Sequence, residues 1–242
     1  MGIYALASLK GGVTKTTTSL MLATSLQGNN LLIDMDHNNN ATDASLRNID
    51  PYEITERNVY HMLTGKLRVE NVIYHSTFGK GFDVIPAAPI LSRINLECAG
   101  DPGVLLRFGT MIRKLQYDNI IIDVHPALVL ELKASFFAAD AVICPVPMSR
   151  WELQGFDLLL NEIQSVSDAI GKCPTIHALP AMTSPTERET IREVIEGVPF
   201  TKTSIPKSAS LKAIQNTATA PKVGSLAAQV FMELAREIES WR

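Results

Sequence analysis

Short apolar runs rich in β-branched residues alternate with longer stretches of helical period along this chain of 242 residues. The runs predict strands at 3–8, 31–35, 82–86, 119–124, 141–146 and 174–179, with a short strand at 200–205. Helices are predicted at 15–27, 91–98, 103–115, 152–170, 185–196, 208–215 and 225–240. This alternation is typical of a doubly wound, mostly parallel α/β sheet with helices on both faces.

The bulk composition favours a single globular domain over residues 1–242. Apolar residues make up 46% of the chain and charged residues 19%, and no apolar run approaches the ~18 residues of a membrane span. The three cysteines fit no metal or redox spacing, so we expect a cytoplasmic protein. The net charge of −3 means that any nucleic-acid surface has to be a local patch.

The first predicted strand leads into the loop LKGGVT, residues 9–14, and then into a helix that begins with Lys15, Thr16 and Thr17. Ligands of open α/β sheets bind where strands end, and a helix amino terminus offers free N–H groups to a phosphate. We expect Lys15 to contact the β- and γ-phosphates of a nucleotide, Thr16 to coordinate Mg²⁺ and Thr17 to contact the α-phosphate. The two glycines of the ordinary phosphate loop are replaced by Leu9 and Thr14.

Two other predicted strands end in carboxylates. The second strand ends in LLIDMD, which places Asp34 and Asp36 on the same strand face, and the fourth runs into Asp123. Asp36 has a plausible role in hydrolysis, and Asp123 would hold a water of the Mg²⁺ shell. A histidine at a turn is more often solvated or packed than catalytic, so we assign no role to His125.

The loop resembles the deviant Walker A signature of the ParA/MinD family of ATPases, through Lys10, Gly11, Gly12 and the run 15–17. The resemblance implies a P-loop NTPase of the SIMIBI class, ATP and Mg²⁺ as cofactors, and a homodimer that sandwiches ATP. It also implies that Lys10 reaches the phosphates held by the other subunit, and that Asp36 orients or activates the attacking water.

The resemblance covers nearly the whole chain but includes departures. The family commonly has Pro-Gln-Gly where this chain has His37, Asn38 and Asn39, and its D-x-P-P pattern is Asp-Val-His-Pro at 123–126. The resemblance also implies that the loop after the sixth predicted strand, at about 181–182, and the backbone near 205–206 frame the adenine. The implied nucleotide-binding residues are Lys10, Gly11, Gly12, Val13, Thr14, Lys15, Thr16, Thr17, Met182 and Pro206; the implied catalytic residues are Lys10, Lys15 and Asp36, and the metal-binding residues Thr16 and Asp123.

One segment favours the DNA-partition branch of this family. Residues 201–222 contain four lysines and no acidic residue, which suits a DNA backbone: Lys202, Lys207, Lys212 and Lys222. We therefore expect nonspecific binding of double-stranded DNA by an ATP-bound, nucleoid-associated dimer, and release by a ParB-type or other centromere-binding adaptor that stimulates weak ATP hydrolysis. The cargo would be a plasmid, a chromosome region or another assembly.

Two alternatives remain open. A MinD-like ATPase that positions cell division at a membrane would need a basic amphipathic helix, whereas the last predicted helix is acidic outside its apolar stripe, so no membrane partner is expected. A dethiobiotin-synthetase-like ligase would have no need of Lys10. The first strand begins at residue 3, with no helix-turn-helix before it, so we expect no operator-specific DNA binding.

Overall fold

The computed structural model describes residues 1–12, 14–101, 103–147, 150–208, 211, 213–214, 217 and 219–241, with backbone only for 150–154 and 170. Within it an eight-stranded sheet has the order β3-β4-β2-β5-β1-β6-β7-β8. The strands are β1 Gly2–Leu6, β2 Asn30–Met35, β3 Tyr74–Ser76, β4 Phe82–Ile85, β5 Asn119–Val124, β6 Ala141–Val146, β7 Thr175–Thr183 and β8 Ile205–Pro206. Only the pairing of β3 with β4 is antiparallel among these strands.

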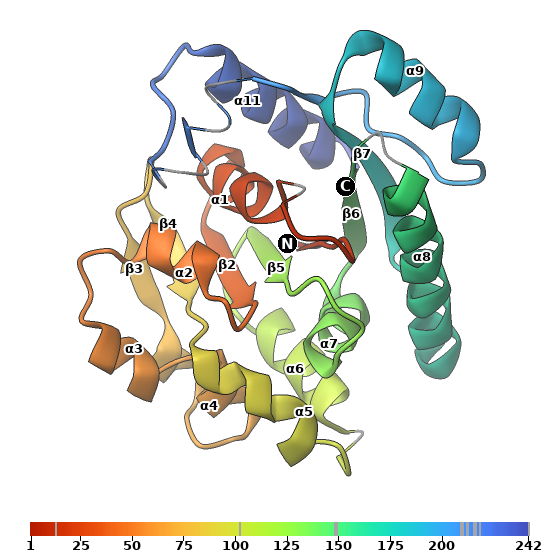
Figure 1. Cartoon of the computed structure of the whole chain (residues 1–242). Coiled ribbons are helices and arrows are strands. Elements are labelled where there is room, and N and C mark those ends of the chain that lie inside the picture. Colours follow the sequence, from red (N-terminus) through yellow and green to blue (C-terminus); the bar gives the residue numbers. More distant parts are fainter. Residues whose placement is uncertain are drawn as a thin grey trace.

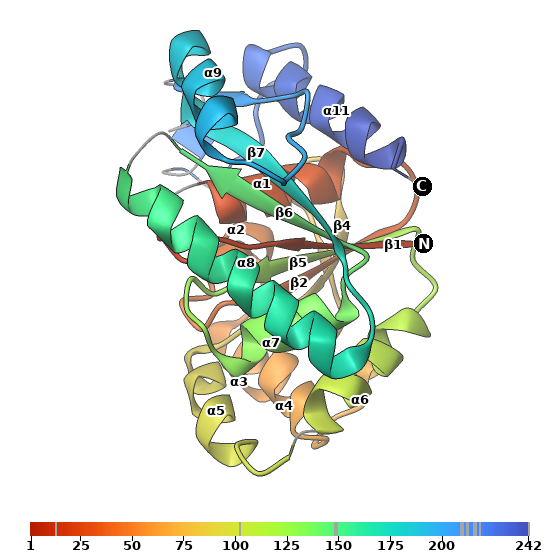
Figure 2. The ribbon, with the colours of Figure 1, turned by 90° about the vertical axis from the view of Figure 1, so that its right-hand side faces the viewer.

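Helices cover both faces of the sheet (Figure 1). They are α1 Lys15–Ser25, α2 Asn40–Ser45, α3 Pro51–Glu56, α4 Val59–Leu63, α5 Ile94–Glu97, α6 Gly103–Arg113, α7 Leu130–Ala138, α8 Arg150–Ile170, α9 Pro185–Val194 and α11 Leu226–Glu239, with 3₁₀ turns at Val69–Val72 and Pro89–Arg93. Figure 2 shows α8 running along one side of the sheet, with α9 and α11 above it. None of the helices in the described ranges is long and apolar enough to cross a membrane.

The strand alternation divides the apolar residues between two cores. Ile120 and Ile122 of β5 point into the core shared with α4, α6, α7 and α8, while Ile121 points into the core beneath α1 and α11. All three isoleucines are fully buried. A strand that is apolar on both faces is typical of a parallel sheet between two helical layers, so β5 belongs at the centre of the fold.

The predicted fold class is confirmed, and the departures from it are local. Strand β3 was missed because it is a three-residue antiparallel edge strand. Helix α7 was missed because it is buried on nearly all sides, which erases the helical period in its sequence. The polar stretch after Asp36 forms three short helices, α2 to α4, whereas its sequence shows one short helical pattern, around 57–67. The predicted helix at 208–215 lies partly outside the described residues.

The placement of Met182 in a loop was wrong. Strand β7 continues to Thr183, because Ala181 and Thr183 pair with Ile205 and Pro206 of β8. The register shifts between those two pairs, and Met182 takes a left-handed φ of 55° at that point. Met182 is therefore a bulged residue inside a strand.

Candidate nucleotide-binding site

The loop between β1 and α1 carries the backbone features of a phosphate-binding turn. Gly12 and Thr14 have left-handed φ angles of 77° and 69°. Glycine adopts this conformation freely, whereas a β-branched residue pays roughly 1–2 kcal/mol for it. Position 14 thus keeps the backbone that the missing glycine of the ordinary loop would have, at the cost of strain in Thr14. An added Cβ on Gly11 or Gly12 would meet nothing within 4 Å, so the space beside both residues is open.

The side chain of Thr14 fits a ligand in this space. It is 4% exposed, and its hydroxyl is buried without a hydrogen-bond partner. A buried polar atom without a partner costs about 1–3 kcal/mol. Because Thr14 also lines the cavity beside the loop, an oxygen of a bound phosphate is the kind of group that would satisfy it.

Lys15 is the buried cation of the site. Its side chain is 6% exposed, and its Nζ donates to the backbone oxygen of Lys10 at 2.8 Å. Burial lowers the pKa of Lys15, whereas the charges of Asp123 and Asp36 raise it. A cation held between two carboxylates at the start of a helix is suited to receive a polyanion.

Asp123 lies beside the hydroxyls at the start of α1. Its Oδ1 accepts from Ser19 Oγ at 2.9 Å, and its carboxylate also bonds the Thr16 side chain. Asp123 is 1% exposed, and burial raises its pKa while Thr16 and Lys15 lower it. A hydroxyl and a carboxylate so placed are oxygen ligands of the type that Mg²⁺ takes, so these residues fit that ion. The contact of Ser19 was missed by the sequence analysis, although Ser19 lies one helical turn after Lys15.

Asp34 and Asp36 occupy different environments. Asp34 is fully buried, and its Oδ2 accepts from the backbone N and the hydroxyl of Thr42 at 2.9 and 2.7 Å. Asp36 accepts from the backbone N of Asn38 at 2.9 Å, and its Oδ1 lies 2.8 Å from Nδ1 of His125. Asp34 is thus held by hydrogen bonds to Thr42 in the interior of the protein. Asp36 instead lines the cavity beside the loop.

The cavity beside the loop has a volume of about 500 Å³. It brings together most of the predicted phosphate-binding residues and Asp36 with several residues that were not predicted. Its lining is Gly11, Gly12, Thr14, Lys15, Thr16, Thr17, Leu20, Asp36, Asn38, Asn40, Asp43, Ala44, Arg47, Pro126 and Ile214. Asp43 lies on α2, and Arg47 lies in the turn after that helix. The polar run directly after β2 is the sequence signal that could have identified both residues.

Lys10 is not among the residues that line this cavity. Its side chain is exposed, and it lines a smaller cavity of about 170 Å³ with Ser8, Pro145 and Phe156. The two lysines of the loop therefore face different spaces. The adenine candidates Met182 and Pro206 do not line the 500 Å³ cavity either, and Val13 lies outside the described residues.

The lysine segment carries less free positive charge than its sequence implies. Nζ of Lys207 lies 2.9 Å from Oε1 of Glu187 on α9, and Glu237 of α11 accepts from the backbone N of Lys202 at 2.6 Å. Lys222 is exposed, and Lys212 lies outside the described residues. Glu187 therefore offsets part of the positive run, whereas Glu237 binds the backbone of the segment.

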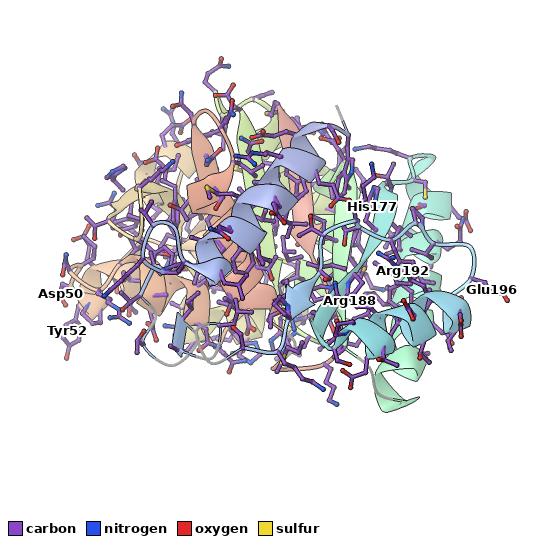
Figure 3. The ribbon with its side chains drawn as sticks, turned by 90° about the horizontal axis from the view of Figure 1, so that it is seen from above. Asp50, Tyr52, His177, Arg188, Arg192 and Glu196 are labelled. Atoms are coloured by element: carbon purple, nitrogen blue, oxygen red, sulfur yellow. The ribbon has the colours of Figure 1, made fainter. Side chains whose placement is uncertain are left out.

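Helix α9 brings arginines to the same segment (Figure 3). Arg188 donates to Oγ of Ser204 at 2.6 Å, and Arg192 donates to the backbone oxygen of Thr201 at 3.2 Å. Arg192 is exposed, so its charge remains available at the surface. These two residues were missed because α9 contains three acidic residues and only two basic ones, so its sequence does not stand out as basic.

Comparison with known proteins places these features in a family. The profile of the AAA domain matches residues 1–175. The sporulation initiation inhibitor protein Soj of Bacillus subtilis is 30% identical over an alignment that covers 98% of this chain and 97% of Soj. The chromosome-partitioning ATPase Soj of Thermus thermophilus is 35% identical over 67% of this chain. The chain spans less than two thirds of some curated relatives, namely 61% of the Thermus protein and 63% of an uncharacterized protein of Pseudomonas putida.

Solved structures show the same fold at lower identity. A plasmid partition protein of Borrelia burgdorferi bound to AMPPNP has a TM-score of 0.83 at 21% identity, with 100% of this chain and 99% of that chain covered. A cobyrinic acid a,c-diamide synthase of Mycobacterium smegmatis, with an ATP analogue and magnesium bound, has a TM-score of 0.85 at 22% identity, with 100% and 96% covered. These likenesses establish the fold and do not separate partition proteins from small-molecule synthases.

Proposed function

Because the chain belongs to the family of ParA-type partition ATPases, we propose that it hydrolyses ATP and uses ATP binding to control a DNA-binding dimer. The observation that carries this proposal is the pair of lysines in one loop. Lys15 lies against the 500 Å³ cavity with the carboxylates, while Lys10, bonded to it through its backbone, lines another space. A loop that only bound its own nucleotide would have no use for the second cation.

The residues around Lys15 would hold ATP with Mg²⁺. The backbone of Gly11 and Gly12 and the start of α1 would contact the phosphates, and Thr16 and Asp123 would hold the metal ion. When bound, Mg²⁺ neutralises charge on the phosphate oxygens. Asp36 would orient the attacking water from the cavity wall, and the adenine would lie toward Met182 and Pro206.

Lys10 would act on the nucleotide of a second copy of the chain. A cation supplied in trans stabilises charge on a transferring phosphoryl group much as an arginine finger does. The exposure of Lys10, and its position away from the cavity of its own chain, support this role. Dimerisation would then depend on ATP.

The dimer would bind the DNA backbone without sequence preference. Lys202, Lys207, Lys212 and Lys222 would contact phosphates, with Arg192 beside them. Four contacts per chain correspond to a slope of log K against log salt of about −3.6, and two chains to about −7. ATP would thereby convert weak DNA binding into strong binding. A ParB-type adaptor that stimulates ATP hydrolysis would release the protein from DNA, and this cycle would move the cargo.

The test is binding to nonspecific duplex DNA in ATP, ADP and no nucleotide across a salt series. We expect tight, salt-sensitive binding in ATP alone. Equal binding in all three conditions, or none in any, would contradict a partition role. The absence of DNA binding together with ATP-dependent consumption of a small carboxylic acid would instead select a small-molecule synthase.

A further inference from the structure

Three potential metal ligands come together next to the proposed catalytic carboxylate. Asp36, His37 and His125 each offer a ligand atom, and these atoms lie within 4.8 Å of one another. The two imidazole rings are in contact, with centroids 4.1 Å apart and planes inclined by 41°. The cluster joins the turns that follow β2 and β5, two neighbouring strands of the sheet.

The two histidines are the departures noted in the sequence. His37 and His125 stand where the family pattern has proline, and the fold brings these two departures into contact. Proline offers no side-chain ligand, whereas imidazole is the most common nitrogen ligand for metals. Each substitution alone is ordinary in a turn, but together with Asp36 they complete a set of three donors.

The geometry is close to that of a transition-metal site. Bonds of 2.0–2.2 Å to a tetrahedral Zn²⁺ place neighbouring ligand atoms roughly 3.3–3.6 Å apart, so side-chain shifts of about 1 Å would close this cluster. Nδ1 of His125 and Oδ1 of Asp36 are 2.8 Å apart, so this pair would open by roughly 0.5–0.8 Å around the ion. A metal ion would take the place of the hydrogen bond between them, and a neutral His125 bound through Nδ1 would carry its proton on Nε2.

The surroundings of the cluster suit a bound cation. Asn38 donates to Asp36 from its backbone N at 2.9 Å and from its side-chain Nδ2 at 3.0 Å, which fixes the carboxylate. The side chains of His125 and Asp36 are 16% and 10% exposed, so an ion can enter from solvent. A buried carboxyl, Glu131, accepts from Asn95 at 3.0 Å and lies within electrostatic range of both histidines.

We propose that Asp36, His37 and His125 bind a divalent transition-metal ion of the Zn²⁺ type, and that this ion inhibits the ATPase by occupying Asp36. Two imidazoles and one carboxylate favour Zn²⁺, Co²⁺ or Ni²⁺ over Mg²⁺, which prefers oxygen ligands. The site is therefore distinct in chemistry from the proposed Mg²⁺ site at Thr16 and Asp123. The inhibitory part rests on the proposed function, whereas metal binding does not.

The first experiment uses the nucleotide-free protein and Co²⁺ as a spectroscopic probe, in millimolar Mg²⁺. We expect one Co²⁺ per chain with visible ligand-field absorption, and full displacement by Zn²⁺. His37→Phe and His125→Phe keep the aromatic contact but remove the nitrogens, and each should weaken binding by roughly ten-fold or more. His75→Phe is the matched control, because His75 also lies 3.0 Å from an aspartate, Asp83, but belongs to no cluster of three such ligands within the described residues.

The wild-type titration alone can overturn the site, since failure to form a one-to-one Co²⁺ complex would exclude it. Unchanged affinity in both His37→Phe and His125→Phe would exclude these ligands.

In the second experiment, the ratio of ATP turnover with and without micromolar Zn²⁺ is measured within each protein. Zn²⁺ should slow wild type and the His75→Phe control but neither site variant. Metal binding without an effect on turnover would refute the inhibition, whereas metal binding by a protein without ATPase activity would refute the proposed function alone.

Discussion

Nζ of Lys15 donates to the backbone oxygen of Lys10 across 2.8 Å, so the buried lysine of the loop holds the backbone of the exposed one. A phosphate that attracts the Lys15 ammonium competes with this carbonyl. We expect that filling the cavity releases the backbone at Lys10, which would link the nucleotide held by one chain to the surface that meets a second chain.

Asp34 is expected to stabilise the fold and not to act in hydrolysis. Asp34→Ala would leave the backbone N and the hydroxyl of Thr42 without an acceptor in a buried site, at a cost of about 3 kcal/mol in unfolding free energy. Asp34→Asn keeps an acceptor oxygen and should lose less. Urea unfolding measures both, with the exposed Asp43→Ala on the same helix as Thr42 as control; an unchanged midpoint for Asp34→Ala would contradict this role.

Asp36 is expected to act in the chemical step. Asp36→Ala should slow single-turnover ATP hydrolysis by roughly 100-fold, the scale of a general base or water-orienting group, while nucleotide affinity is kept. Because this variant keeps its ATP unhydrolysed, it should also stay bound to DNA for longer than wild type. Asp43→Asn removes another carboxylate from the same cavity and serves as control. Rapid turnover by Asp36→Ala would remove the proposed role of this residue.

The sequence predicted the sheet and the turn between its first strand and first helix because both depend on local signals. Apolar runs such as 119–124 mark a buried strand, and two glycines before Lys15 mark a turn at a helix start. Other features depend on tertiary contacts. The ion pair of Lys207 with Glu187 joins residues 20 positions apart, and His37 meets His125 only because β2 and β5 are neighbours. Neither pairing can be read from spacing in one sequence.

Glu187 is expected to weaken the proposed DNA surface. It pairs with Lys207 through Oε1 and Oε2, at 2.9 and 3.2 Å. Glu187→Gln would free Lys207 for a phosphate and steepen the slope of log K against log salt by about 0.9 for each further phosphate that the protein neutralises, whereas Lys207→Glu should flatten it. Glu196→Gln makes the same charge change elsewhere on that side of the molecule and is the control (Figure 3). Identical slopes for all four proteins would exclude this surface, provided that nucleotide affinity is unchanged.

Glu187 should also give stability a defined pH dependence. Bonds from the backbone N of Ser184 and from Lys207 lower its pKa from 4.5 to about 2. A depressed carboxyl pKa stabilises the folded state above the unfolded pKa, and the contribution is lost as pH falls through the folded value. The melting temperature of wild type should therefore exceed that of Glu187→Gln at pH 6, and the two should converge between pH 4.5 and about 2. A constant difference across that range would contradict this assignment.

Sedimentation velocity with Mg²⁺ and AMPPNP tests the role of Lys10 most directly. Wild type and the surface control Lys114→Ala should be monomeric without nucleotide and dimeric with AMPPNP. Lys10→Ala should bind a fluorescent ATP analogue yet stay monomeric, because it lacks the cation for its partner's phosphates. Wild type that stays monomeric when saturated with AMPPNP, or Lys10→Ala that forms the dimer equally well, would contradict the account.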